Sequence, residues 1–272
     1  MNSKHYEHHL AVAMVFQDCA RFLAEWIEFH RLMGVEKFHL YNNASTDDCQ
    51  RVLAPYVASG LVELLEWGES FERFSSWDEC QNNAYDHALQ KTIGKVKWLA
   101  FIDSDEFLFP VTAETLPPIL DQYSSFGGVC VNWQTFGTAH IERVPDDKLL
   151  TECLQLALPA NDKQNLHVKS IVRPERCQRA VNPHYLIYKP GYFQVDTDGN
   201  RFGGPFSDSV LNDKLRINHY RYRDEQYYRE HKAPRRKKWK LQEDEELYRL
   251  ANTVSDSVIQ RFVPELKRRI RL

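Results

Sequence analysis

Four short apolar runs alternate with three helical patterns through the first hundred residues of the chain. The apolar runs, which predict strands, cover residues 10–16, 36–41, 61–66 and 96–102. The helical patterns between them cover residues 20–33, 48–58 and 77–91. A strand–helix repeat at this spacing produces βαβ units, and a run that is apolar at every position fits a strand buried on both faces. We therefore expect an α/β fold with a mostly parallel central sheet flanked by helices.

The rest of the chain is less regular. The sequence predicts a strand over 128–133, a helix over 146–158, short strands over 166–173 and 184–188, a mobile loop over 191–206 and a long charged helical pattern over 223–250. No stretch rich in Pro, Gly or Ser separates two folding units among the 272 residues, so we expect one large folded body.

Composition argues against several classes of protein. Hydrophobic residues make up 43% and charged residues 27% of the chain, which is ordinary for a globular protein and excludes disorder or a small disulfide scaffold. No apolar run reaches the about 18 residues of a membrane span, and the first residues lack the apolar core of a secretory signal. Since the sequence lacks a secretory signal, we expect its six cysteines to be reduced thiols in the cytoplasm. No pair of them is spaced as C-x-x-C, so we expect no zinc site.

An acidic cluster follows the fourth predicted strand. Asp103 and Asp105 are two positions apart, a spacing that places both carboxylates on one side of an extended chain. Paired carboxylates suit a hard divalent cation such as Mg²⁺ or Mn²⁺, and that cation can bridge a diphosphate. A solvated acidic turn or a helix cap would use the same residues. Because apolar runs flank the cluster on both sides, we favour a cation site at this end of the sheet.

A polar loop follows the second predicted strand, at the same edge of the sheet. Asn42 and Asn43 offer amide groups for a nucleobase or a ribose, although a turn chosen only for its geometry would use the same residues. Asp47 is better explained as a cap of the next helix. On the first predicted helix, Trp26 belongs to the apolar stripe, whereas Glu25 could neutralise a buried cation or meet a hydroxyl partner.

Charge is divided unevenly along the chain, whose net charge is −3. Residues 219–272 hold 15 Lys and Arg against 9 Asp and Glu, whereas the first 218 residues hold 20 against 29. Apolar residues interrupt the basic runs at 231–240 and 266–272, a pattern that suits an anionic membrane surface; a solvated helix face is the alternative. The acidic body and the lack of a nucleic-acid-binding motif argue against a nucleic-acid partner.

An ordered set of motifs resembles glycosyltransferase family 92 and related bacterial transferases. The first motifs are Phe22–His30, Gly34-Val35 and Leu40–Asp47. The later ones, in chain order, are Gln81, Trp98, the Asp-x-Asp-Glu-Phe run 103–107 with Pro110, Trp133 with Phe136-Gly137, Lys169 with Ile171-Val172, Pro183-His184, and His219-Tyr220 with Lys232. One departure lies at the end of the first strand, where the family usually has Lys-Asn-Glu and this chain has Gln17-Asp18-Cys19.

This resemblance implies a GT-A fold, which is Rossmann-like, and inverting transfer of a sugar from a nucleotide donor, most often UDP-galactose. It implies Mn²⁺ or Mg²⁺ on Asp105, with Asp103 on the metal or the ribose and His219 as either a third ligand or a structural histidine. The other site residues that it suggests are Asn42, Asn43, Gln81 and Lys169 toward the donor, Trp133 and His184 toward the acceptor, and Asp208 or His140 as general base. Lys169 and His184 would serve equally well in an ion pair or in packing.

The resemblance also implies an organisation and a set of partners. Residues 1–218 would form the catalytic domain, with a nucleotide-binding half at about 8–110 and an acceptor half at about 111–218, and 219–272 a basic helical extension packed on the same domain. The partners would be a UDP-sugar, a glycan or lipid-linked glycan acceptor and the cytoplasmic face of a membrane. Two other functions stay open: a non-catalytic sugar- or nucleotide-binding module, and a sugar nucleotidyltransferase. Residues 16–22 (FQDCARF) lack the Gly-rich phosphate loop of the latter.

Overall fold

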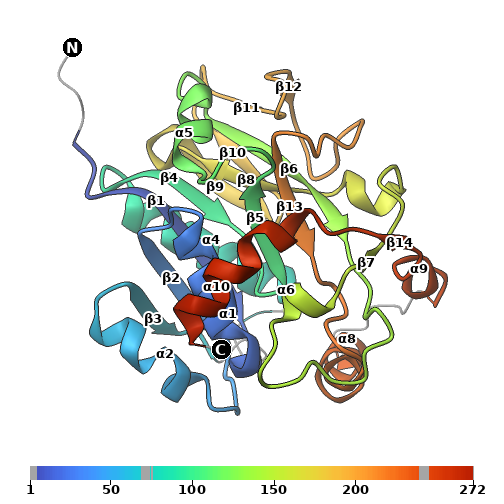
Figure 1. The fold of residues 1–272 in the computed structure, drawn as a ribbon. Coiled ribbons are helices and arrows are strands. Elements are labelled where there is room, and N and C mark those ends of the chain that lie inside the picture. The colour runs from blue at the N-terminus through green and yellow to red at the C-terminus, as the bar shows by residue number, and fades with distance from the viewer. Residues whose placement is uncertain (1–4, 69–73, 75, 239–244, 272) are drawn as a thin grey trace.

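The computed structural model describes residues 5–68, 74, 76–238 and 245–271. These residues form a ten-stranded sheet in the order β12-β11-β6-β8-β4-β1-β2-β3, with β13 pairing with both β5 and β6 (Figure 1). The strands of this sheet are β1 (His8–Phe16), β2 (Lys37–Asn42), β3 (Val62–Glu66), β4 (Val96–Phe101), β5 (Glu106–Pro110), β6 (Gly128–Thr135), β8 (Val168–Val172), β11 (Gln194–Val195), β12 (Arg201–Phe202) and β13 (Leu215–His219).

Two small sheets and several helices complete the fold. The small sheets pair β9 (Cys177–Asn182) with β10 (Tyr185–Tyr188) and β7 (Leu156–Ala157) with β14 (Val254–Ser255). The helices are α1 (Ala20–Leu32), α2 (Cys49–Ala58), α4 (Trp77–Thr92), α5 (Pro117–Leu120), α6 (Leu150–Cys153), α7 (Glu225–Tyr227), α8 (Ala233–Lys238), α9 (Glu245–Leu250) and α10 (Val263–Ile270), with a π-helical turn at Tyr228–Lys232.

The first half of the sheet is parallel and the second half is mixed. β1 pairs in parallel with β2 and with β4, and β2 pairs in parallel with β3. β8 then runs antiparallel to both β4 and β6. The expected α/β class, with a central sheet flanked by helices, is confirmed.

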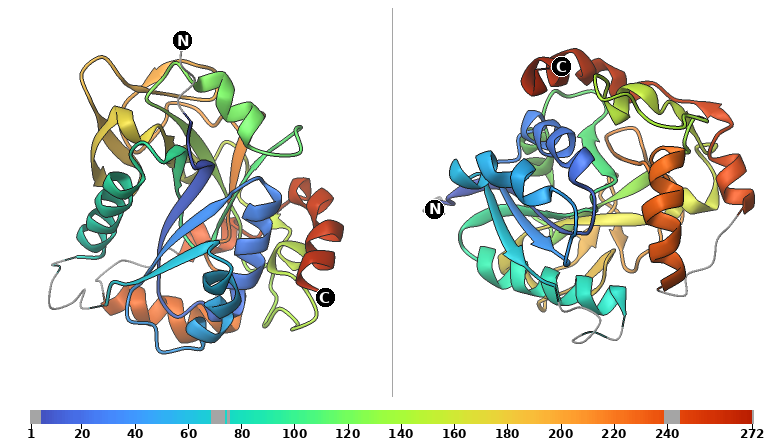
Figure 2. Two further views of the ribbon diagram at one scale, coloured as in Figure 1. Left: turned by 90° about the vertical axis from the view of Figure 1, so that its left-hand side faces the viewer. Right: turned by 90° about the horizontal axis from the view of Figure 1, so that it is seen from below.

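The apolar first strand is buried on both faces, as its composition predicts. Leu10, Val12, Met14 and Phe16 belong to one core cluster, and Ala11, Ala13 and Val15 belong to the other. Figure 2 shows why both faces need apolar side chains: α4 covers one face of the sheet, and α1, α2 and α10 lie on the other. Side chains of a strand alternate between the two faces, so a strand between two helical layers has no position for a polar residue.

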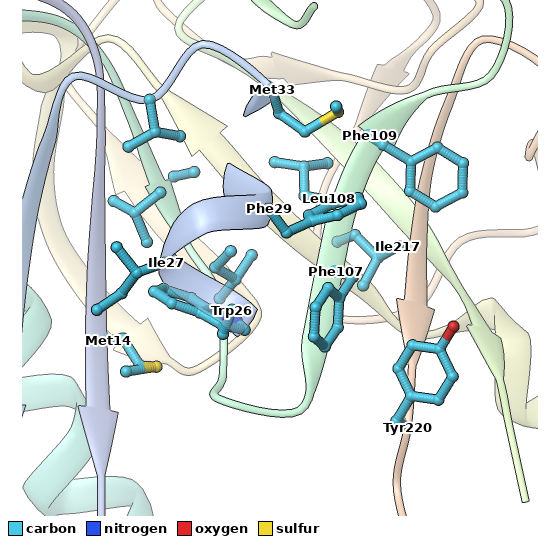
Figure 3. Close-up of a cluster of buried hydrophobic side chains, with 14 of the residues drawn as sticks. Met14, Trp26, Ile27, Phe29, Met33, Phe107, Leu108, Phe109, Ile217 and Tyr220 are labelled. Carbon is cyan, nitrogen blue, oxygen red and sulfur yellow. The ribbon is translucent and has the colours of Figure 1, made fainter. Parts of the chain in front are cut away.

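Helix α1 packs against β5, the strand that follows the acidic cluster. Phe29 of α1 faces Phe107 and Leu108 of β5, as Figure 3 shows. The rings of Phe29 and Phe107 meet edge to face with centroids 5.2 Å apart. This contact fixes the start of β5 on the body of the domain, and the acidic turn lies directly before it.

Some expected elements differ from those in the structure. Strands β5, β9 and β13 were not expected, and the loop over 191–206 contains the short strands β11 and β12. The helix expected over 146–158 is wrong: only Leu150–Cys153 is helical, because Leu156–Ala157 pairs with β14 almost a hundred residues later. The helical pattern over 223–250 is divided into α7, a π-helical turn, α8 and α9, and its residues 239–244, including Trp239, lie outside the described part of the chain.

Helix α10, near the end of the described chain, packs on the body of the protein. The apolar side chains of α10, Val263 and Leu266, are buried in the core, and Lys267, Arg268 and Arg269 pair with glutamates. Packing therefore accounts for the amphipathic pattern of 266–270, and contact with an anionic membrane stays a prediction. None of the described helices has the length and apolarity that a membrane span requires. The boundary predicted after residue 218 falls just before His219, the last residue of β13, and stays a prediction.

Candidate active site

The acidic turn between β4 and β5 is fixed by three buried or partly buried hydrogen bonds. The indole Nε1 of Trp26 donates to the carbonyl oxygens of Glu106 at 2.8 Å and Asp103 at 3.2 Å. The backbone N–H of Asp103 donates to the carboxylate of Glu106 at 2.9 Å. Burial raises the pKa of Glu106 well above its usual range, against the opposing charge of Lys169. The turn therefore keeps a fixed shape, and the two aspartates project from it in fixed directions.

Asp103 is surrounded by donors from two other elements. Lys169 of β8 places its ammonium 2.7 Å from Asp103 Oδ2, and Gln81 of α4 donates to Oδ1 at 2.5 Å. Tyr85, one turn after Gln81, donates to Oδ1 at 3.3 Å. Burial lowers the pKa of Lys169, but the carboxylates of Asp103 and Glu106 outweigh it and raise that pKa above its usual value. The residues predicted at 81, 103 and 169 thus meet, and protein donors engage both oxygens of Asp103.

Asp105 faces a different set of partners. Its Oδ1 lies 3.7 Å from His219 Nε2, and its Oδ2 accepts a hydrogen bond from the ammonium of Lys232. Strand pairing brings His219 here, because β13 runs antiparallel to β5 with His219 opposite Glu106. Burial raises the pKa of Asp105, yet Lys232 and His219 outweigh it and hold that pKa well below its usual range. Burial lowers the pKa of His219 to about 4, so its ring is neutral at pH 7.

A cleft opens over these aspartates at the carboxyl ends of β1 and β4. Its described lining includes residues 15–17 from β1 and its end, the turn 103–105, Trp77, Trp133 and His219. Its other described lining residues are basic: Arg221, Lys232, Arg235 and Arg236. Four basic side chains therefore surround two carboxylates, an arrangement that suits an anionic ligand held beside a cation.

The residues at Asp105 fit a divalent cation with few protein ligands. Among the described residues, no group of three or more His, Cys, Asp or Glu side chains converges. Asp105 and His219 do converge, with a carboxylate oxygen and a neutral ring nitrogen facing each other, and the Lys232 ammonium already holds a positive charge at that carboxylate. Mg²⁺ and similar ions are often held by one or two protein ligands plus the phosphates of a substrate. Asp105 and His219 would hold the ion, while Asp103 is turned toward Lys169 and Gln81.

Aromatic rings continue from the cleft toward the surface. The ring centroids of Trp133 and His219 lie 4.2 Å apart. Trp133 also stacks on His167, with ring centroids 4.7 Å apart and ring planes at 11°. His167 in turn meets Phe206, whose side chain is 55% exposed. His184 packs edge-on against Trp133, and its Nδ1 lies 2.8 Å from the carbonyl oxygen of Val168. The indole N–H of Trp133 is buried without a hydrogen-bond partner, so a polar atom of a ligand would supply the acceptor that this donor lacks.

Besides Gln81, Lys169 and His184, four predicted site residues lie outside the described lining of the cleft. Asn42 donates to Glu66 at 2.9 Å and accepts from the backbone N–H of Ser45, so it shapes the turn after β2. Asn43 is fully buried beside it. Asp208 and His140, suggested as general base, are both exposed. Their roles in donor binding and catalysis stay predictions.

The structure also assigns roles that the sequence pattern left open or missed. Glu25 accepts hydrogen bonds from the backbone N–H groups of Leu150 and Thr151, and so ties α1 to the start of α6. Arg223 is buried and donates to the backbone and the hydroxyl of Ser104, between the two aspartates. Its position at φ +57° after β13 carries no signature in the sequence.

These features define an α/β protein with an acidic turn and a basic cleft at the carboxyl ends of its parallel strands. A model of glycosyltransferase family 92 matches residues 11–258, and the chain belongs to that family.

Three similar proteins illustrate how far the likeness extends. A glycosyltransferase family 92 protein of Oryza sativa subsp. japonica is 29% identical over 228 residues, which cover 81% of this chain and 35% of that protein. A β-1,4-galactosyltransferase of Caenorhabditis elegans is 29% identical over 94 residues, covering 34% of this chain and 22% of that one. The structure of S. aureus TarS 1-349 in complex with UDP superposes with a TM-score of 0.42 and 12% identity, covering 77% of this chain and 60% of that one. The chain spans about a third of the length of the rice relative.

Proposed function

We propose that this protein is a metal-dependent glycosyltransferase that moves galactose from UDP-galactose to a glycan acceptor with inversion. The observation that carries the proposal is the cleft, in which the Asp105–His219 pair lies beside four basic side chains. Membership of glycosyltransferase family 92 supports sugar transfer, and the galactosyltransferase name of the worm relative supports galactose.

The charges of the cleft suit the diphosphate of such a donor. Arg221, Arg235 and Arg236 line the cleft and would offset phosphate charge, which grows on the leaving group as the sugar departs. A divalent cation on Asp105 and His219 would add charge stabilisation of the same kind. The Lys169–Asp103–Gln81 cluster would hold the floor of the site rigid beneath the donor.

The aromatic residues provide a place for the acceptor. Trp133, His167 and Phe206 extend from the cleft to the surface, and sugar rings bind with their apolar faces on aromatic side chains. The unpartnered indole N–H of Trp133 would donate to a sugar hydroxyl. The acceptor would therefore approach over Phe206.

The test is release of UDP from a panel of UDP-sugars, with Mn²⁺ or with EDTA, in the presence of oligosaccharide acceptors. We expect one sugar, galactose, to give metal-dependent release. Asp105→Asn should lower the rate by about 100-fold or more, because it weakens the site of the cation that would stabilise the charge developing on the UDP leaving group. Asp146→Asn, at a carboxylate that is 82% exposed and pairs only locally with Arg143, is the control and should behave as wild type.

Two outcomes would count against the proposal. UDP binding without turnover of any donor would favour the non-catalytic binding module. Production of pyrophosphate from UTP and a sugar phosphate would favour the nucleotidyltransferase.

A further inference from the structure

Asp105, the carboxylate that fits a divalent cation, already forms an ion pair with the ammonium group of Lys232. Lys232 reaches Asp105 Oδ2 from the π-helical turn Tyr228–Lys232, and the side chains of both residues are only 12% exposed. His219 lies on the other oxygen of the same carboxylate. A divalent ion that binds Asp105 and His219 must therefore compete with the Lys232 ammonium for one carboxylate.

The displaced ammonium would have no favourable place in the ligand-free cleft. Of the carboxylates in the described lining, Asp103 is already engaged by Lys169 and Gln81. The other charged groups of that lining are Arg221, Arg235 and Arg236, which repel an ammonium. Leaving a charge in a mostly buried position without a partner is costly, so the cation alone should bind weakly.

A diphosphate in the same cleft would remove this penalty. Its negative oxygens would accept the released Lys232 ammonium, while the metal takes the place of that ammonium at Asp105. The segment that carries Lys232 suits such a shift, because none of the residues Tyr228–Lys232 is fully buried and π-helical turns occur frequently at functional sites.

We propose that Lys232 couples metal binding to diphosphate binding: it holds Asp105 when the cleft is empty and transfers to the diphosphate when metal and nucleotide bind together. The inference rests on the proposed function, because it takes a nucleoside diphosphate and a divalent ion as the ligands. Coupling between two ligands is reciprocal, so UDP must strengthen Mn²⁺ binding by the same factor by which Mn²⁺ strengthens UDP binding. A factor of about 5 to 150 is typical of such coupling.

The test measures binding and needs no sugar transfer. Free Mn²⁺ is followed by electron paramagnetic resonance with and without saturating UDP, and UDP binding is followed by calorimetry with and without Mn²⁺. In the wild-type protein we expect each ligand to tighten the other at least fivefold. Equal Mn²⁺ affinity with and without UDP would overturn the proposal, whatever any variant does.

Two variants then identify the residue that is responsible. Lys232→Met keeps the aliphatic stem and removes the charge, so it should bind Mn²⁺ alone several-fold more tightly, bind UDP more weakly and lose most of the coupling. Lys237→Met, at an exposed position one turn further on in α8, is the matched control and should keep all three wild-type values. Weaker binding of Mn²⁺ alone to Lys232→Met, or unchanged coupling in a folded variant, would contradict the assignment.

The outcomes separate this inference from the proposed function. Coupled binding of Mn²⁺ and UDP without turnover of any UDP-sugar would leave the inference standing and overturn the transferase. Sugar transfer by a protein that binds the two ligands independently would do the reverse.

Discussion

His30 of α1 is held in one protonation state by its two hydrogen bonds. The residue is fully buried, its Nε2 accepts the backbone N–H of Leu108 at 3.2 Å, and its Nδ1 lies 2.8 Å from the carbonyl oxygen of Trp26. Because Leu108 donates to Nε2, the single ring proton must lie on Nδ1, where it is donated to Trp26. A second proton on Nε2 would face another donor. Burial lowers the pKa of His30 from 6.5 to about 3.

This shift makes folding sensitive to acid, and its sign follows from proton counting. Below pH 6.5 the unfolded chain takes up a proton at His30, whereas the native state does so only near pH 3, so the unfolding free energy falls as the pH falls between these values. At about 1.4 kcal/mol per pH unit, His30 alone removes about 2 kcal/mol of stability between pH 7 and pH 5. Burial also lowers the pKa of His39, His184 and His219, which add losses in the same direction.

The variant His30→Asn separates the contribution of His30 to this loss of stability from those of the other histidines. His30→Asn leaves the Leu108 N–H without an acceptor and should cost about 1–3 kcal/mol at pH 7. It has no ring to protonate, so its loss between pH 7 and pH 5 should be smaller than that of wild type by about 2 kcal/mol. Urea unfolding at the two pH values, followed by tryptophan fluorescence, measures both quantities. His140→Asn, at an exposed position with φ +58°, is the control and should keep the wild-type pH dependence. Equal pH losses in wild type and His30→Asn would refute the reasoning.

Three further predictions concern buried polar contacts. Trp26→Phe removes the donor to the Glu106 carbonyl and should lower the unfolding free energy by about 1–3 kcal/mol in urea; no change would mean that the indole N–H does not hold the acidic turn. Glu25→Gln replaces an acceptor of three donors and should cost about 1.5–3 kcal/mol in the same assay, with a value near zero contradicting the bond assignment. Lys169→Met removes a fully buried ammonium from Asp103, whose side chain is 29% exposed, and from the buried Glu106, and should cost about 3–5 kcal/mol. Lys267→Met, at a pair whose side chains are 29% and 25% exposed, should cost less than about 1 kcal/mol, and thermal unfolding of the two variants tests the contrast.

Much of the first half of the fold was predictable because its signals are local. Strands β1 to β4 and helices α1, α2 and α4 agree with the expected ranges to within about two residues, since apolar runs and helical spacing repeat within each segment. The acidic turn was predictable for the same reason, as two aspartates directly follow an apolar strand. Family motifs then added Gln81, Lys169 and His219, which the structure brings to that turn.

The second half was less predictable because distant partners decide its structure. The segment after Leu149 has helical spacing, yet it stops after one turn where Leu156–Ala157 finds a strand partner in Val254–Ser255. Strand β13 ends with His219 opposite Glu106, and no local pattern in either strand encodes that pairing. Tertiary pairing outweighs local propensity in such segments.

The sequence by itself determined the α/β class, the layered core and the position of the acidic turn, because these follow from periods of two and 3.6 residues along short stretches. Only the tertiary structure decided which side chains meet at that turn. Asp105 and Lys232 are 127 positions apart, and a π-helical turn with no sequence signature sets the direction of the lysine. The charge balance of the cleft depends on such long-range contacts, which no local pattern encodes.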